Sequence, residues 1–235
     1  MIKEAIILAG GFGTRLQSVL GDIPKSMAIV NDKPFLHYLL QYLRFYNVQR
    51  AVLSVSTRSS DIEKYFKENY NGIELVYAYE NEPYGTGGGI LHALKYCTAD
   101  NVLVLNGDTL FSVDLFQMSE SHKKNQAEFT LALKYYDEVG RFGTVSMDHK
   151  FRITGFEEKK DTKREGCING GVYLLNRKLF TSINFPQAFS IEKEFFEKYC
   201  EHFRFFGFVS NKYFIDIGIP DDYERAQHEF KTYQF

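Results

Sequence analysis

The sequence predicts an α/β fold, in which a mostly parallel sheet is flanked by helices and continues into an α+β extension. Short apolar strands alternate with helices over about the first hundred residues. Such an alternation gives a parallel sheet that helices cover on both faces. Beyond Asp108 the strands follow one another more closely, which is typical of an α+β arrangement. A chain of 235 residues can bury one sizeable core.

The first half carries the strand and helix alternation. Residues 3–9 form a compact apolar run that ends at Gly10 and Gly11, as a buried strand leading into a glycine loop does. Leucines at helical spacing follow Pro34, and the residues from Ser60 have the spacing of a capping box, so both segments predict helices. The predicted strands are 3–9, 51–55, 73–79 and 101–105, and the predicted helices are 34–47, 60–69 and 89–96.

The second half is predicted to be richer in strands. The predicted strands are 128–135, 144–147, 152–157 and 171–175, and the predicted helices are 114–125, 191–202 and 220–231, the last two around a strand pair at 204–208 and 212–215. No repeat or low-complexity linker divides the chain, so we expect one domain, 1–235, with a nucleotide-binding half (1–110) and a second half (111–235). The 16 Tyr and 22 Phe residues favour aromatic core packing, with a subunit interface as the alternative.

Composition excludes several classes of partner. With Lys+Arg 28 against Asp+Glu 30 the net charge is -2, which argues against a nucleic-acid binder. No apolar stretch approaches the roughly 18 residues that span a bilayer, and the N-terminus lacks a signal-peptide core. The three cysteines, Cys97, Cys167 and Cys200, are far apart in the sequence and odd in number, which favours reduced thiols over a disulfide framework. We therefore expect a cytoplasmic protein without a membrane partner, and a homodimer is one option for its assembly.

A glycine loop with two cations predicts a phosphate site. Gly10, Gly11 and Gly13 follow the first strand, and glycines let backbone N–H groups approach phosphate oxygens closely. Arg15 and Lys25 add cations that can hold several phosphate oxygens. The loop is neither a Walker A motif nor a dinucleotide fingerprint, which would have a third glycine further on.

Two aspartates predict a metal site. Asp108 and Asp216 each follow a strongly apolar strand, so both carboxylates can face the carboxyl edge of the sheet. Carboxylate and phosphate oxygens are the ligands that Mg²⁺ prefers. Asp108 alone could instead cap a turn. The histidines show no H-x-H or H-E-x-x-H pairing, so a histidine metal site has no support.

Seven ordered motifs resemble those of the sugar-1-phosphate nucleotidyltransferases. Residues 8–16 resemble the signature L-A-G-G-x-G-T-R-L, and residues 24–27 resemble P-K-P-M, with Ser26 in place of the second proline. The further matches are 80–89 (base recognition), 106–108 (metal), 156–159 (the sugar-phosphate motif F-x-E-K), 169–173 (sugar) and 214–220 (second metal segment).

The resemblance implies a Rossmann-like fold with a sugar-binding extension, and it implies site residues. The catalytic candidates are Arg15, Lys25 and Asp108, and the metal ligands are Asp108 and Asp216, for Mg²⁺. The nucleotide-binding candidates are Leu8, Ala9, Gly10, Gly11, Gly13, Thr14, Arg15, Lys25, Ser56, Glu80, Gly85, Thr86, Gly107 and Asp108. The sugar-phosphate candidates are Gly143, Glu158, Lys159, Asn169, Gly170 and Val172. Glu80 is the candidate for guanine recognition, an exposed strand-end carboxylate being the alternative.

The implied reaction joins a nucleoside triphosphate and a sugar 1-phosphate into a nucleotide sugar, with release of pyrophosphate. It needs no serine or cysteine nucleophile, because a sugar phosphate is already largely deprotonated at neutral pH. The resemblance favours GTP and D-glycero-α-D-manno-heptose 1-phosphate, and a role in surface glycan biosynthesis. Alternatives are a mannose 1-phosphate guanylyltransferase, or a glucose 1-phosphate enzyme that uses UTP or dTTP.

Two readings from other classes are less favoured. A non-catalytic sensor of nucleotide sugars would be expected to lose one of the cations or carboxylates, which are all present. In a Rossmann dehydrogenase the acidic residue lies at the end of the second strand, whereas Asp32 precedes that strand.

Overall fold

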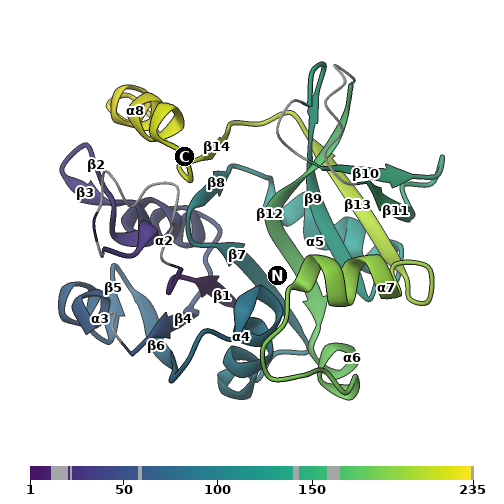
Figure 1. The fold of residues 1–235 in the computed structure, drawn as a ribbon, viewed down its shortest axis with the longest axis horizontal. Helices are drawn as coiled ribbons and strands as arrows, with labels where there is room; N and C mark the ends of the chain where they lie inside the picture. Colours follow the sequence, from purple (N-terminus) through teal and green to yellow (C-terminus); the bar gives the residue numbers. More distant parts are fainter. Residues whose placement is uncertain (12–20, 22, 58–59, 140–142, 158–164, 234–235) are drawn as a thin grey trace.

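A ten-stranded mixed sheet forms the centre of the protein in this computed structural model (Figure 1). The structure describes residues 1–11, 21, 23–57, 60–139, 143–157 and 165–233. Along the main path of the sheet the strand order is β11-β10-β12-β7-β1-β4-β6-β5, while β9 pairs with β12 and β13 pairs with β9. The Rossmann-like α/β class that the sequence predicts is confirmed.

The first half of the chain supplies the parallel part of the sheet. β1 (Glu4–Leu8) lies between β4 (Arg50–Ser56) and β7 (Asn101–Asn106), and β6 (Ile73–Glu80) lies beside β4. All of these pairings are parallel, so the carboxyl ends of the four strands meet at one edge. Ligands of open α/β sheets bind at this edge.

The second half extends the sheet with mainly antiparallel pairings. The long strand β12 (Gly166–Asn176) pairs antiparallel with β7 and thereby joins the two halves. The same strand also pairs with β9 and β10. The remaining strands are β9 (Phe129–Tyr136), β10 (Thr144–Met147), β11 (Ile153–Glu157) and β13 (Phe205–Ser210).

Helices cover both faces of the sheet, and each face has its own apolar core. Along β1, Ala5 and Ile7 belong to one core and Ile6 belongs to the other, as the alternation of side chains along a strand requires. The helices are α2 (Phe35–Phe45), α3 (Ser60–Phe66), α4 (Gly85–Ala93), α5 (Leu115–Lys124), α6 (Arg177–Ser182), α7 (Glu197–Tyr199) and α8 (Pro220–Glu229). The helical turns are η1 (Lys25–Met27), η2 (Leu94–Tyr96) and η3 (Glu192–Phe196).

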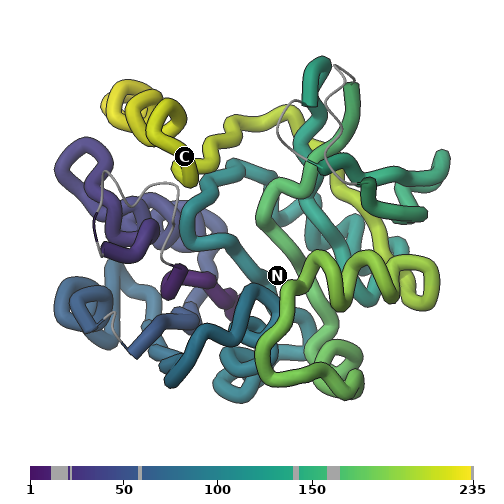
Figure 2. Tube along the Cα trace, in the orientation of Figure 1, coloured from purple at the N-terminus to yellow at the C-terminus, as the bar shows by residue number. Residues whose placement is uncertain are grey.

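Short strands complete the fold: β2 (Ile29–Val30), β3 (Lys33–Pro34), β5 (Asn69–Tyr70), β8 (Thr109–Phe111) and β14 (Phe214–Asp216). The C-terminal helix α8 returns to the first half, as the chain trace in Figure 2 shows. There the side chains of Tyr223 and Gln227 both donate hydrogen bonds to the carbonyl oxygen of Ile29. The C-terminal helix is therefore tied to the first half of the chain through β2.

Several predicted segments differ from the structure. The helix predicted at 60–69 ends at Phe66, because Lys67 adopts a left-handed conformation with φ 56° and the chain then enters β5. The segments predicted as a strand pair do form strands, but they do not pair with each other. β13 pairs with β9, and β14 pairs with β8.

The other differences concern helices. The helix predicted at 89–96 begins at Gly85, since the glycines that resemble a loop form its first turn. The helix predicted at 191–202 is a π-helical turn followed by the short α7, and it ends at Tyr199. Local propensity gives no sign of the start at Gly85, because close packing against residues 187–189 positions the glycines.

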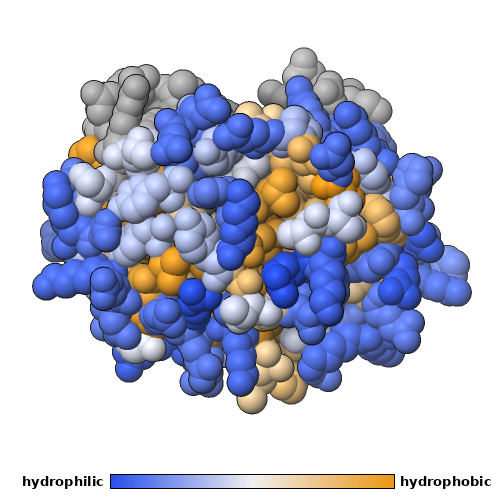
Figure 3. Space-filling model, turned by 90° about the horizontal axis from the view of Figure 1, so that it is seen from below, coloured by the Kyte–Doolittle hydropathy of each residue, from blue (hydrophilic) through white to orange (hydrophobic). Residues whose placement is uncertain are grey.

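The aromatic residues confirm core packing. Phe129, Phe195, Phe196 and Phe205 are fully buried and contact one another through their rings. The three cysteines are free thiols. On the face seen in Figure 3 hydrophilic side chains predominate, and apolar side chains gather near its middle. Among the described residues, no helix combines the length and the apolar character needed to cross a membrane.

Candidate active site

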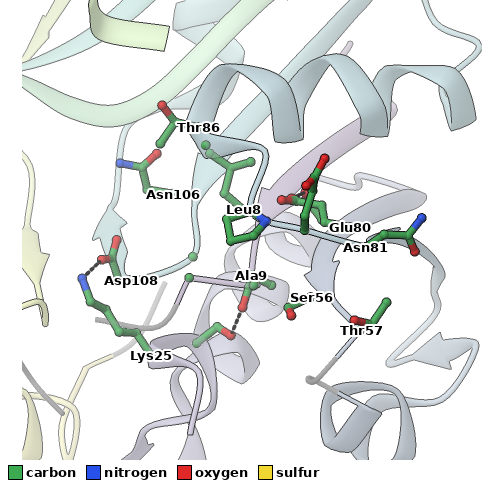
Figure 4. Close-up of a pocket in the computed structure, with 18 residues that line it drawn as sticks. Leu8, Ala9, Lys25, Ser56, Thr57, Glu80, Asn81, Thr86, Asn106 and Asp108 are labelled. Carbon is green, nitrogen blue, oxygen red and sulfur yellow. Dashed lines mark hydrogen bonds and ion pairs between the residues drawn. The ribbon is translucent and has the colours of Figure 1, made fainter. Parts of the chain in front are cut away.

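A cavity of about 560 Å³ lies at the carboxyl edge of the parallel strands (Figure 4). Leu8, Ser56, Glu80 and Asn106, which end four neighbouring strands, line it. Other predicted nucleotide-binding residues also line this cavity: Ala9, Gly10, Gly11, Lys25, Gly85, Thr86, Gly107 and Asp108. The structure therefore brings together every predicted nucleotide-binding residue that it describes.

The floor of the cavity depends on a close approach of two strand ends. A Cβ atom on Gly107 would lie 2.3 Å from the carbonyl oxygen of Leu8, so only glycine fits there. The amide of Gly107 donates a hydrogen bond to the same oxygen, at 3.2 Å. The strand ends that carry Leu8 and Asp108 are therefore held next to each other.

The segment that carries Lys25 is docked directly on the glycine loop. The amide of Lys25 donates to the carbonyl oxygen of Gly11 at 3.2 Å. The buried Ser26 hydroxyl donates to the carbonyl oxygen of Ala9 at 2.8 Å. Ser26 is the residue that departs from the P-K-P-M pattern, and here its hydroxyl fixes the loop against the first strand.

Lys25 and the two aspartates converge at one end of the cavity. Lys25 Nζ and Asp108 Oδ2 form an ion pair at 2.7 Å. Asp216 follows on β14, whose register places it opposite Thr109, the residue after Asp108. A Cβ atom on Gly218 would lie 2.8 Å from Asp216 Oδ1 and 3.3 Å from Lys25 Nζ, so these two groups border the same small space.

This donor set fits a hard divalent cation. Asp108 and Asp216 contribute carboxylate oxygens, which Mg²⁺ prefers, and Mg²⁺ commonly takes only one or two carboxylates together with substrate phosphate oxygens. Within the described residues, no group of three or more His, Cys, Asp or Glu side chains could hold a metal by itself. A magnesium ion at this place would therefore need the phosphates of a bound nucleotide to complete its ligands.

Glu80 is held rigidly beneath the opposite end of the cavity. Its Oε1 accepts a hydrogen bond from the Ser54 hydroxyl at 2.5 Å, and its Oε2 accepts one from the amide of Tyr84 at 3.0 Å. A carboxylate has about four acceptor positions, so both oxygens keep capacity for a ligand. Glu80 is thus a fixed acceptor and not the freely exposed strand-end carboxylate of the alternative interpretation.

A second cavity of about 610 Å³ adjoins the first, and Asn106 lines both. Gly143, Asn169 and Asp216 from the predicted sites line it. Gly170 and Val172 are buried beside it on β12, and the Val172 side chain belongs to an apolar core. In place of Gly170, its neighbour Gly171 faces the cavity.

Asn169 is oriented by a buried tyrosine. Its Nδ2 donates to the Tyr173 hydroxyl at 2.9 Å, and its Oδ1 accepts from the amide of Gly171 at 3.0 Å. Burial raises the pKa of the Tyr173 phenol, with the nearby carboxylate of Glu192 adding to the effect, so the phenol stays neutral. The Asn169 side chain is therefore locked against the cavity wall.

The remaining predicted site residues, Gly13, Thr14, Arg15, Glu158 and Lys159, lie outside the described residues. Conversely, sequence reasoning missed Ser54, Ser26 and Glu192 as part of these cavities. Ser54 had a readable signal, because it is the only polar residue between Ala51 and Val55 in an otherwise apolar strand. Glu192 gave none, since it sits in a charged stretch that reads as the solvated face of a helix.

Fold and cavities together are those of an α/β protein with a ligand cavity at the carboxyl edge of its parallel strands and a second cavity beside it. The chain belongs to the nucleotidyl transferase family, whose model matches residues 4–232. It is 47% identical to the D-glycero-alpha-D-manno-heptose 1-phosphate guanylyltransferase of Aneurinibacillus thermoaerophilus over 230 residues, which are 98% of this chain and 99% of that protein. A protein of the same name from Campylobacter jejuni is 42% identical over 94% of this chain and 96% of its own length.

A solved structure agrees with this assignment. HddC from Yersinia pseudotuberculosis, crystallised in complex with GMP-PN, superposes with a TM-score of 0.87 at 39% sequence identity, over 97% of this chain and 100% of that chain. The mannose-1-phosphate guanylyltransferase of Mycobacterium tuberculosis is more distant, at 32% identity over 95% of this chain and 63% of that protein.

Proposed function

We propose that the protein transfers a guanylyl group from GTP to D-glycero-α-D-manno-heptose 1-phosphate. A phosphate oxygen of the sugar phosphate attacks the α-phosphorus of GTP, a new P–O bond forms, and the bond to the β-phosphate breaks. The products are a GDP-heptose and pyrophosphate. No proton has to be removed from the attacking phosphate, so the chemical difficulty is the meeting of two anions.

One observation carries the proposal: two cavities meet at Asn106, with Lys25, Asp108 and Asp216 at their junction. A nucleotide in the first cavity and a sugar phosphate in the second would bring their phosphates together there. Lys25 would then neutralise charge as the pyrophosphate leaves, and alignment supplies much of the catalysis. The identities of 47% and 42% to heptose 1-phosphate guanylyltransferases support the choice of substrates.

We propose that Asp108 and Asp216 hold Mg²⁺ when substrates are bound. The ion would supply electrostatic stabilisation to the transferring phosphoryl group. We assign guanine recognition to Glu80, because a carboxylate accepts from the N–H groups of guanine, whereas adenine offers no N1–H donor. Arg15 is the further proposed phosphate ligand, and Lys159 and Glu158 are proposed ligands of the sugar phosphate.

The positions of the cavities support a functional division of the chain. The described residues that line the first cavity fall between positions 8 and 108, and those that line the second fall between positions 106 and 216. We therefore propose 1–110 as the nucleotide half and 111–235 as the sugar-phosphate half of one domain. The three free thiols support a reducing compartment, and we propose the cytoplasm, with a homodimer as the assembly to test by light scattering. The product would feed surface glycan synthesis.

The test is pyrophosphate release with Mg²⁺, with GTP, ATP, UTP, CTP and dTTP each offered against heptose, mannose and glucose 1-phosphates. The proposal expects the highest kcat/KM for GTP with the heptose phosphate. A higher value for mannose 1-phosphate would instead favour the activity of the more distant relatives. Binding of nucleotide without release from any pair would support a sensor and would refute the proposed reaction.

A further inference from the structure

A π-helical turn forms part of the wall of the second cavity. In η3, Glu192–Phe196, the amide of Glu197 bonds to the carbonyl of Glu192, five residues earlier. Glu192, Lys193, Phe196 and Glu197 line the cavity. Single π-helical turns are rare, and they frequently occur at functional sites. The wider turn lets consecutive charged residues reach the cavity while Phe195 stays in the core.

The carboxylate of Glu192 is held in place by one of its oxygens. Oε2 accepts hydrogen bonds from the Thr86 hydroxyl at 3.0 Å and from the Ser190 hydroxyl at 2.7 Å. Thr86 is itself fixed, because its Oγ1 accepts from the amide of Ile191 at 2.9 Å. Among the residues that the structure describes, none donates a hydrogen bond to Oε1 of Glu192. The side chain is thus oriented with one acceptor to spare.

An oriented carboxylate in this cavity selects for hydroxyl groups. A hydroxyl that donates to an ionised carboxylate forms a charge-assisted hydrogen bond, which is about twice as strong as a neutral one. A phosphate group, in contrast, would be repelled by Glu192 and attracted to Lys25. Glu192 therefore fits the polyhydroxylated part of a sugar phosphate and not its phosphate.

We propose that Glu192 is a substrate-binding residue that accepts a hydrogen bond from a sugar hydroxyl, with Thr86 and Ser190 as its positioning residues. The inference rests on the proposed function, since it takes the second cavity as the sugar site. Thr86 also lines the first cavity, so the same hydrogen bond links the walls of the two cavities. Glu192 acts on binding of the sugar and takes no part in breaking the phosphate bond.

The experiment compares Glu192→Gln with the matched control Glu194→Gln. Glu194 lies on the same turn, and its carboxylate accepts from the amide of Ser190, but it does not line either cavity. We expect Glu192→Gln to raise KM for the heptose phosphate about tenfold, which is the loss typical of one hydrogen bond to a charged group. KM for GTP should stay within about twofold. The control should leave both constants within about twofold.

Substrates that lack single hydroxyls separate direct contact from a structural effect. Among mono-deoxy analogues of the sugar phosphate, one should bind to wild type more weakly than the parent sugar phosphate does. The Glu192→Gln protein should bind that analogue and the parent sugar phosphate equally well. A purely structural role would lower affinity for every analogue to the same degree. Such a uniform loss, an equal rise in both KM values, or unchanged constants would each overturn the proposal.

Two safeguards keep the test decisive. If Glu192→Gln fails to fold, Ser190→Ala removes one donor to Oε2, and it should raise KM for the sugar phosphate alone by a few-fold; no rise would refute the inference. If wild type releases no pyrophosphate with any sugar phosphate, the proposed function fails. An active wild type with an unaffected Glu192→Gln overturns this inference only.

Discussion

At the scale of single residues, Asp108 is the most exacting test of the site. Asp108→Asn keeps the shape of the side chain but removes the charge that pairs with Lys25 and that we assign to the metal. Loss of a charged group that stabilises the transition state lowers kcat by about 100-fold or more. We therefore expect activity to fall by at least that factor and Mg²⁺ titrations to saturate at higher concentration, both measured by pyrophosphate release.

The matched control for this change is Asp114→Asn. Asp114 caps α5, where its Oδ1 accepts from the amides of Phe116 and Gln117, and asparagine caps helices about as well as aspartate. This variant should keep wild-type activity and wild-type metal dependence. A fully active Asp108→Asn protein would remove the metal assignment.

Ser54 allows a second test at this scale, on the choice of base. Its buried hydroxyl fixes Oε1 of Glu80, so Ser54→Ala would let that carboxylate turn away from the nucleotide. Hydrogen bonds to charged groups contribute about 1.5–3 kcal/mol, so the preference for GTP over ATP in kcat/KM should fall roughly tenfold or more. Ser119→Ala, at another buried serine, is the control and should leave the preference unchanged. Unaltered selectivity in Ser54→Ala would show that Glu80 does not read the base from this position.

At the scale of elements, the glycine-rich start of α4 links the two cavities. The amides of Gly87 and Gly88 both donate to the carbonyl oxygen of Phe189, and the amide of Phe189 donates to the carbonyl oxygen of Tyr84. A Cβ atom on Gly88 would lie 2.2 Å from the carbonyl oxygen of Gln187, which is backbone and cannot move aside easily. The glycines thus allow a close contact between helix and loop.

This contact predicts that Gly88→Ala destabilises the protein and weakens nucleotide binding. Overpacking costs about 1–3 kcal/mol, which for a chain of this size lowers the melting temperature by roughly 2–10 °C. KM for GTP should rise because Thr86 lies in the same helical turn. Gly155→Ala is the control, since a Cβ atom there meets nothing within 4 Å, and thermal unfolding compares the two. Equal melting temperatures would show that the loop at residues 187–189 yields without cost.

At the scale of the whole molecule, the sequence predicts the parallel sheet because apolar strands alternate with helices at regular spacing. It also predicts that Glu80, Asp108 and Asp216 follow or end strands, and the cation behind the glycine loop gives Lys25, so all four could be named as candidates. Their partners could not be predicted, because the Lys25–Asp108 pair joins residues 83 positions apart and depends on the docking of the η1 turn on the glycine loop. Pairing of β13 with β9 is likewise a long-range choice that local pattern does not encode.

Stability against acid is a property of the whole molecule that His122 should influence. His122 lies on α5 and is 3% exposed, and its Nδ1 and Thr130 Oγ1 of β9 share a hydrogen bond of 2.8 Å. Burial lowers the pKa of His122 from 6.5 to about 4, so the unfolded chain binds a proton there at a higher pH than the folded chain does. The unfolded state is therefore favoured as pH falls from 6.5 to 4, and the free energy of unfolding loses up to about 3 kcal/mol from this residue.

Replacement of His122 by a residue that does not titrate should flatten this dependence. His122→Gln keeps a polar group for Thr130. The variant is expected to be less stable than wild type at pH 7.5, but its free energy of unfolding should fall less than that of wild type between pH 6.5 and 4. His228→Gln, a substitution at an exposed histidine, is the control. Urea unfolding at several pH values measures the difference. Parallel curves for His122→Gln and wild type would mean that the protonated imidazole is accommodated in the folded protein, and that acid sensitivity arises from other groups.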